Sequence, residues 1–140
     1  PNGEIMVLFS YKIMILNADG SFNRDVLSGP VTINRKLFSP FRFDVQPDGK
    51  IVSLGSVRWG STDQIAVARF NPDGEVDTSF AARGLYLRQT NQPAALDRIL
   101  IQPDGKILGV SGVFTVTDIA LMRLLGSSSP APSTGKPLDR

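Results

Sequence analysis

Oxygen-bearing side chains recur at alternate positions in the segment Asn71-x-Asp73-Gly74-x-x-Asp77. Carboxylate and amide oxygens spaced in this way are the ligands that calcium loops supply. The segment has no bidentate glutamate at its end, however, and its first oxygen is not acidic. Asn and Asp also form turns by hydrogen-bonding their own backbone. We therefore expect a turn here, with calcium held by Asn71, Asp73 and Asp77 as the alternative, and no other cofactor.

The chain has few residue types that could act in catalysis, because it has no histidine and no cysteine. The commonest general base, the commonest transition-metal ligand and the thiol nucleophile are all missing. Serine and aspartate are present, but nucleophilic catalysis needs a base positioned beside the nucleophile. The sequence shows no such pair. We expect no catalytic residues and a protein that is not an enzyme.

Trp59, with Arg58 beside it, is the best single candidate for contact with a ligand. Residues 58–63 are expected to form an exposed loop, and an aromatic face with a polar rim suits a sugar or a protein. A tryptophan that covers the edge of the core is an equal alternative. Arg69 and Arg123 recur at equivalent positions of two strands and could bind an anion. We favour a structural role for them, in which each pairs with an aspartate of an adjacent turn.

The elements that must position these residues are turns, because one motif recurs. "QPDGKI" stands at residues 46–51 and again at 102–107, "NPDG" stands at 71–74, and "PNGEI" opens the chain. Proline presets φ for the second position of a type I turn, and glycine takes the left-handed position that follows. Apolar runs flank the motif, which predicts β-hairpins. The expected structural turn residues are Pro47, Asp48, Gly49, Pro72, Asp73, Gly74, Pro103, Asp104 and Gly105.

The spacing of the motif predicts the fold class. Pro1, Pro47 and Pro103, which begin equivalent turns, are 46 and 56 residues apart, and this spacing is typical of repeat architectures. No segment has sustained apolar spacing of three and four, so little or no helix is expected. An all-β chain of antiparallel four-stranded units describes propeller blades, with a sandwich of hairpins as the alternative. In the third unit the four strands are expected at residues 85–88, 96–102, 106–113 and 119–125.

The chain is expected to hold about two and a half blades, an incomplete ring, since a closed propeller needs at least four. The repeat domain would span residues 1–126, with units of about 1–30, 31–84 and 85–126, followed by a Ser/Pro-rich tail or linker at 127–140. Residues 4–9 and 11–16 are half a blade, either as a tight hairpin or as one bent strand. The chain opens inside a turn motif, so we expect that it starts within a longer natural chain.

The combination of "QPDGKI" with "ARFNPDGEVDTSF" at residues 68–80 resembles the delta-sixty repeat, a bacterial tandem-repeat family taken to be propeller-like. The third unit matches in "IQPDGKI" and "ALMRLL", and the first keeps only "PNGEI" and "NADGSF". The resemblance covers most of residues 1–126. It implies a propeller-like fold and a secreted or cell-surface location, and it implies no activity, because the family has no assigned biochemical function.

Charge and hydropathy limit the classes of partner. The 15 basic and 13 acidic residues are scattered along the chain, unlike the basic footprint of a nucleic-acid-binding protein. The apolar runs are far shorter than the roughly 20 residues that a membrane span needs. We therefore expect neither nucleic acid nor a membrane span. Protein is the expected partner, recruited by strand pairing at the open edge that carries Ile5, Val7 and Phe9.

The expected function is a non-catalytic structural or interaction module of a secreted or cell-surface bacterial assembly. Its blades would be completed by other chains or by missing sequence. A carbohydrate-binding propeller fragment that uses Trp59 is the alternative. A third hypothesis is a sensor or enzyme propeller whose active residues lie in missing blades.

Overall fold

The computed structural model describes residues 3–60, 62–88, 94–113 and 119–124, which form strands joined by turns. The strands are β1 (Ile5–Phe9), β2 (Lys12–Leu16), β3 (Phe22–Leu27), β4 (Val31–Ile33), β5 (Lys36–Val45), β6 (Ile51–Trp59), β7 (Thr62–Phe70), β8 (Leu85–Arg88), β9 (Ala94–Ile101), β10 (Ile107–Val113) and β11 (Ile119–Leu124). These residues include no helix, and so none that could cross a membrane. The expected all-β fold is confirmed.

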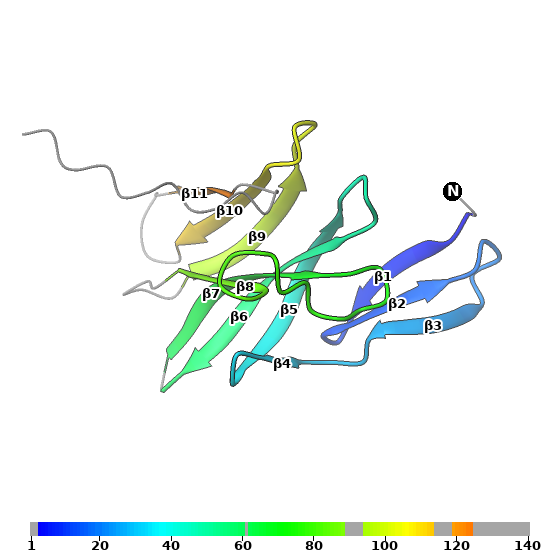
Figure 1. The fold of residues 1–140 in the computed structure, drawn as a ribbon, viewed down its shortest axis with the longest axis horizontal. Coiled ribbons are helices and arrows are strands. Elements are labelled where there is room, and N and C mark those ends of the chain that lie inside the picture. The colour runs from blue at the N-terminus through cyan, green and yellow to red at the C-terminus, as the bar shows by residue number, and fades with distance from the viewer. Residues whose placement is uncertain (1–2, 61, 89–93, 114–118, 125–140) are drawn as a thin grey trace, which may run out of the picture.

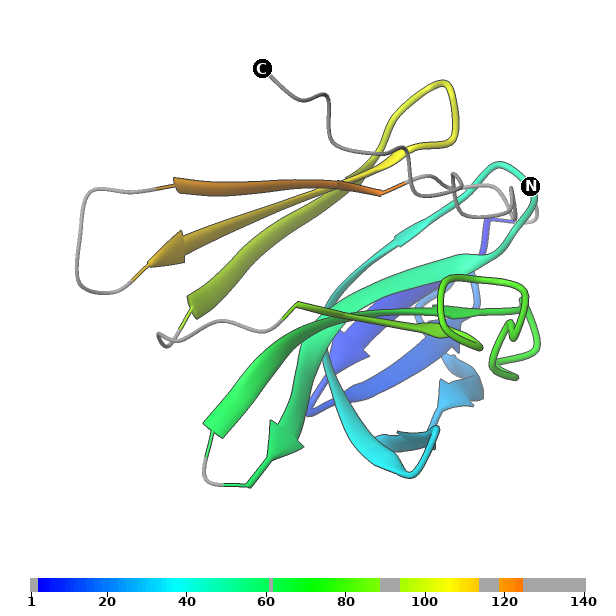
Figure 2. The ribbon, with the colours of Figure 1, turned by 60° about the vertical axis from the view of Figure 1, so that its left-hand side comes forward.

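The strands form three antiparallel sheets, each built from strands that are consecutive in the sequence. The first sheet has the order β1-β2-β3, the middle sheet β4-β5-β6-β7-β8 and the third sheet β9-β10-β11. Figures 1 and 2 show them as successive layers, with the middle sheet between the other two. Antiparallel sheets layered in sequence order agree with the predicted blades of an incomplete propeller.

The core has two layers, one on each face of the middle sheet. Alternate residues of a strand face opposite sides, and β7 obeys this rule. Ala66, Ala68 and Phe70 pack toward the first sheet, whereas Ile65 and Val67 pack toward the third, as the sequence predicts. The first layer is completed mainly by Ile13, Leu27, Phe38 and Ile51, and the second by Val52, Leu54, Ile99 and Ile107.

The turn motif folds in the same way at four places. In the turn of residues 46–50, the Gly49 N–H donates to the Gln46 carbonyl at 2.8 Å and the Gln46 N–H donates to the Lys50 carbonyl at 2.8 Å. The Asp48 carboxylate accepts the Lys50 N–H at 3.1 Å. The same three bonds recur in residues 17–21, 71–75 and 102–106. The glycine of each turn has a positive φ, between 77° and 92°. The type I turn followed by a left-handed glycine is confirmed.

Gly105→Val should lower the free energy of unfolding by about 1–3 kcal/mol, because valine resists the left-handed backbone that φ of +77° requires. A Cβ at this position would meet no atom within 4 Å, so the effect is backbone strain alone. Chemical denaturation measures it. Gly105→Asn is the matched control, since asparagine tolerates this conformation. Equal stability of the two variants would contradict the turn assignment.

The first sheet is larger than the half blade expected. Phe22–Leu27, which is not among the strands expected from the sequence, forms β3 and pairs with β2. The sequence of β3 lacks the apolar alternation of a half-buried strand. Its first residues are exposed, and its buried side chain, Leu27, stands at the very end. Ser10 and Tyr11 have φ of 49° and 65°, which makes β1 and β2 a tight hairpin and excludes the bent strand. Asn34 and Arg35 join β4 to β5 in the same way.

The placement of Leu85–Arg88 in the third unit is wrong. This strand, β8, pairs with β7 from Ala68↔Leu85 to Ile65↔Arg88 and so ends the middle sheet. The reason is the loop before it, which folds back on the sheet. Val76 bridges Phe70 at the start of this loop, and the Arg69 N–H donates to the Gly84 carbonyl at its end. The tail at 127–140 lies outside the described residues.

Candidate interaction surface

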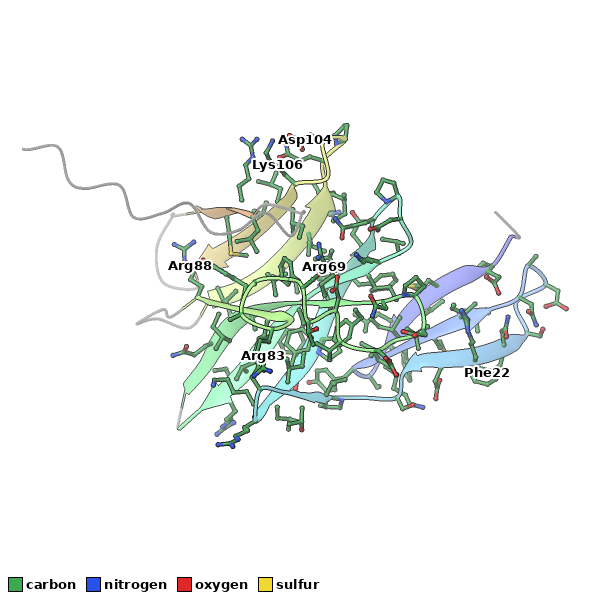
Figure 3. All side chains as sticks on the ribbon, in the orientation of Figure 1. Phe22, Arg69, Arg83, Arg88, Asp104 and Lys106 are labelled. Atoms are coloured by element: carbon green, nitrogen blue, oxygen red, sulfur yellow. The ribbon has the colours of Figure 1, made fainter. Side chains whose placement is uncertain are left out.

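One face of the first sheet is apolar and uncovered within the described part of the chain. The other face of this sheet packs on the middle sheet through Met6, Leu8 and Ile13. Because Ile5 pairs with Leu16 and Val7 with Met14, these side chains share the opposite face. Ile5 is 46% exposed, Phe9 67% and Phe22 62%. Phe22, which pairs with Leu16, lies on the first sheet away from the other two sheets (Figure 3). We call this surface the outer apolar face: Ile5, Val7, Phe9, Met14, Leu16 and Phe22.

A polar rim borders the outer apolar face. Lys12, opposite Phe9, forms an ion pair with Asp25 of β3 at 3.4 Å. At the other end, the Asn23 amide donates to the Glu4 carboxylate at 3.0 Å. Exposed apolar patches rimmed by polar residues mark interaction sites on soluble proteins.

The edge strand β1 adds backbone groups to this surface. In the sheet order of the described residues, β1 has a partner on one side only, which is β2. The opening "PNGEI" gives β1 the place in its repeat that β6 and β10 have in theirs. Those two strands each have a second neighbour, β5 and β9. The structure thus places Ile5, Val7 and Phe9 on an edge strand, as the sequence predicts.

The most buried charges of the described residues belong to a structural ion pair. Arg69 is 2% exposed and Asp77 is 6% exposed. Arg69 Nε lies 2.8 Å from Asp77 Oδ2, and Lys50 Nζ lies 3.4 Å from the same oxygen. The guanidinium also stacks on the ring of Phe80, 4.9 Å from its centroid. Figure 3 shows Arg69 in the middle of the molecule. The structural reading of Arg69 is confirmed.

The environment of Asp77 holds its carboxylate in the charged form. Burial raises the pKa of Asp77, but the effect of its partners is larger in sum. Ser79 donates both its hydroxyl, at 2.6 Å, and its backbone N–H, at 3.0 Å, and the charges of Arg69 and Lys50 act in the same direction. The pKa of Asp77 therefore lies below its ordinary value. Arg123 resembles Arg69 in having an aspartate of a turn nearby, Asp104 at 3.8 Å, although both are exposed.

The calcium candidates Asn71, Asp73 and Asp77 each make contacts of their own within the protein. Asp73 accepts the Glu75 N–H at 2.9 Å within its own turn, and Asn71 supplies the backbone bonds that close that turn. Asp77 is engaged by two cations. Among the residues that the structure describes, no group of three acidic side chains could hold a metal ion. Asn71 and Asp73 thus form the expected turn, and calcium at these residues stays the untested alternative.

The expected loop at 58–63 is shorter than its sequence implies. Arg58 pairs with Asp63 and Trp59 with Thr62, so the hairpin continues almost to its tip at Gly60. Arg58 is exposed. The side chain of Trp59 lies outside the described part of the structure, so its contact with a sugar or protein stays a prediction.

Sequence reasoning missed the residues that join one sheet to the next. Gln46 is 7% exposed and donates from Nε2 to the Gly105 carbonyl, at 3.4 Å, across the middle and third sheets. Asp44 accepts the Ile101 N–H at 2.9 Å across the same boundary. The available signal was the glutamine before both "PDGK" turns, which the turn itself does not need.

Comparison with known proteins supports the repeat. The model of a domain of unknown function (DUF5122), described as a β-propeller, matches residues 46–80 and 102–133. These segments contain the two complete turn motifs. No match was found among curated proteins or solved structures. The match supports the β-propeller repeat for these two segments, and the finer resemblance to the delta-sixty repeat stays a prediction.

Proposed function

We propose that this chain is a non-catalytic protein-interaction module of a secreted or cell-surface bacterial assembly. Its first sheet would be completed by a strand from outside the described residues, which pairs with β1. One observation carries this proposal. β1 occupies the repeat position of β6 and β10, yet it lacks the neighbour that β5 and β9 provide to them in the described residues.

The edge of β1 offers what strand addition requires. Unpaired N–H and C=O groups recruit another strand through main-chain hydrogen bonds, and adjacent side chains give the contact its specificity. The neighbouring strands also define where the added strand would lie. β5 and β9 contact each other between the middle and third sheets. A strand added to β1 would lie against β5 in the same manner, and β1 already contacts β5.

The outer apolar face supports the same proposal. Its exposed Ile5 and Phe9 lie on the open edge strand itself, and Phe22 lies on the same face at β3, so a partner strand could carry with it a whole sheet that covers them. Burial contributes about 25 cal/mol for each Å² of apolar surface removed from water. Edge and face together form one continuous interaction surface.

A peptide with the sequence of β9, residues 94–101, should bind to the protein and pair with β1. β9 is the strand that occupies this place beside β10 in the third sheet. Fluorescence anisotropy of a labelled peptide measures binding. Backbone NMR shifts locate it, with changes in β1 and little change at the far edge, β3.

The matched control is the same peptide with proline at the position of Arg98, because proline removes a ladder donor. Specific binding of the native peptide at β1, lost with the proline peptide, would support the proposal. If neither this peptide nor one with the sequence of β5 shifted the β1 resonances, strand addition would be wrong.

A further inference from the structure

We infer that the outer apolar face of the first sheet receives the third sheet of a second copy of this chain, stacked head to tail. The inference rests on the proposed function and names its partner. Two observations carry it: the way in which the three sheets stack, and the identity of the residues at equivalent positions of the first and third sheets.

At both contacts between sheets, the equivalent face of the earlier sheet packs on the sheet that follows it in the sequence. The first sheet turns Met6 and Leu8 toward the middle sheet. The equivalent residues of the middle sheet, Val52 and Leu54, turn toward the third sheet. Each sheet thus has a donor face, which packs on the next sheet, and a receiving face, which is packed upon. The first sheet keeps its receiving face uncovered among the described residues, and this is the outer apolar face.

The third sheet shows what such a receiving face contains when it is covered. It packs on the middle sheet partly through Ile107, Met122 and Leu124. The first sheet has Ile5, Met14 and Leu16 at the same repeat positions, and the ladder pair Ile107↔Leu124 matches the pair Ile5↔Leu16. The same three residue types therefore recur in the same register. On the third sheet Ile107 is fully buried, whereas on the first sheet Ile5 is 46% exposed.

The third sheet of the same chain carries a donor face of the right kind. Leu108 and Val110 occupy the positions of Val52 and Leu54, and Arg123 occupies the position of Arg69. Leu108 pairs with both Leu100 and Arg123, so these side chains share that face. Leu100 is half exposed, and the face lies opposite the contact with the middle sheet. A second copy thus provides the donor that the outer apolar face lacks.

A polar contact fixes the register of the docking. Between the middle and third sheets, the Gln46 amide donates to the Gly105 carbonyl at 3.4 Å. Gln102 has the place of Gln46 in the third turn, and Gly3 has the place of Gly105 in the first. Stacking the third sheet of one copy on the first sheet of the next would bring the Gln102 amide to the Gly3 carbonyl.

The number of sheets predicts the number of copies. The described residues of one copy form three sheets, so two copies bring six and three copies bring nine. Closed propellers typically have about four to eight blades. A head-to-tail contact generates a ring when its rotation closes. For the 140-residue chain taken by itself, the expected assembly is therefore a ring of two copies with two equivalent interfaces.

Light scattering and analytical ultracentrifugation of the full chain over a range of concentrations test this assembly. The wild-type chain should have twice the mass of one chain. Ile5→Lys, on the receiving face, and Leu108→Lys, on the donor face, should each yield monomers, because each removes both interfaces of the ring. Leu37→Lys is the matched control, since Leu37 is an exposed apolar residue on neither face, and it should leave the dimer intact.

Mixing Ile5→Lys with Leu108→Lys protein should restore a two-chain complex, because one of the two interfaces then joins intact faces. Gln102→Ala, a milder change in a turn, should weaken the dimer about 10- to 100-fold, as expected when one neutral hydrogen bond is lost at each of the two interfaces. It keeps the test valid if a lysine variant fails to fold.

A wild-type chain that stays monomeric at every concentration but binds the β9 peptide would overturn the inference and leave the proposed function standing. A Leu108→Lys protein that still dimerised would also overturn it, since the outer apolar face would then pair with itself. The head-to-tail ring would be supported if the wild-type chain formed a dimer, each single variant were a monomer, and the mixture of the two variants formed a two-chain complex.

Discussion

Asp77→Ala should lower the free energy of unfolding by about 3–5 kcal/mol, because it leaves the buried guanidinium of Arg69 without its counter-ion. Ser79, at 3.3 Å from the guanidinium, and the ring of Phe80 carry no negative charge that could replace it. The substitution also removes the acceptor of the two hydrogen bonds from Ser79. Chemical denaturation followed by circular dichroism measures the effect.

The chain itself offers the control. At the repeat positions of Arg69 and Asp77, the first sheet has Ile15, which is buried, and Asn23, which is exposed. The double variant Arg69→Ile/Asp77→Asn should recover most of the lost stability, because it leaves no unpaired buried charge and the asparagine amide oxygen can still accept from Ser79. A double variant no more stable than Asp77→Ala would show that the loop geometry at Asp77, and not the charge, carries the effect.

Acid adds a second measurement of the same pair. The pKa of Asp77 is lower in the folded protein than its ordinary value, so its contribution is complete above about pH 4, where the unfolded chain is also ionised. That contribution is lost as pH falls through the folded pKa. The wild-type protein should therefore lose more stability below about pH 4 than the Arg69→Ile/Asp77→Asn variant. Parallel curves for the two proteins would contradict this assignment.

Gly55→Ala should lower the free energy of unfolding by about 3 kcal/mol, near the upper end of the usual range for overpacking a core. A Cβ at Gly55 would stand 2.1 Å from the Ser39 carbonyl oxygen and 2.8 Å from the ring of Phe38. The obstacle is backbone, so β5 and β6 must separate at the bulge beside Pro40. Phe38, which is fully buried, would lose its contact with Phe70.

Gly109→Ala is the matched control, since Gly109 also lies inside a strand. The atom nearest to its added Cβ would be Met122 Cε, at 3.0 Å, the end of a flexible side chain that can move aside, and Met122 Cβ would lie at an ordinary 3.9 Å. Its effect should be below about 1.5 kcal/mol, as for substitutions that a core can absorb. If Gly55→Ala and Gly109→Ala were equally stable, the close approach of β5 to β6 would be wrong.

The sequence predicts the local structure well because local structure depends on near neighbours. The turn at Asp48 and Gly49 follows from four adjacent residues, and the alternation in β7 follows from the period of a strand. The pairing of Arg69 with an aspartate was also predictable, since it spans only eight residues. The need of Ile5–Phe9 for a cover could also be expected, because the residues on both of its faces are apolar.

The features that escape prediction depend on distant segments. β8 belongs to the middle sheet because the loop between Phe70 and Leu85 returns the chain beside β7, and no residue of β8 itself encodes that return. The role of Gln46 depends on a turn 59 residues away. The outer apolar face could be recognised as an interaction surface only from the stacking of the sheets. That stacking shows that Met122 and Leu124, which are equivalent to Met14 and Leu16, pack on the middle sheet.

The sheet order has a consequence for cooperativity. Every strand of the described residues pairs only with strands next to it in the sequence, and each sheet packs only on the sheets before and after it. Such a chain behaves almost as a one-dimensional array, whose stability is a sum of local units and nearest-neighbour couplings. Within one copy the middle sheet is coupled on both sides, while each terminal sheet is coupled on one. In an unassembled copy, opening should therefore begin at the terminal sheets and reach the middle sheet last, so that local stability is graded along the chain.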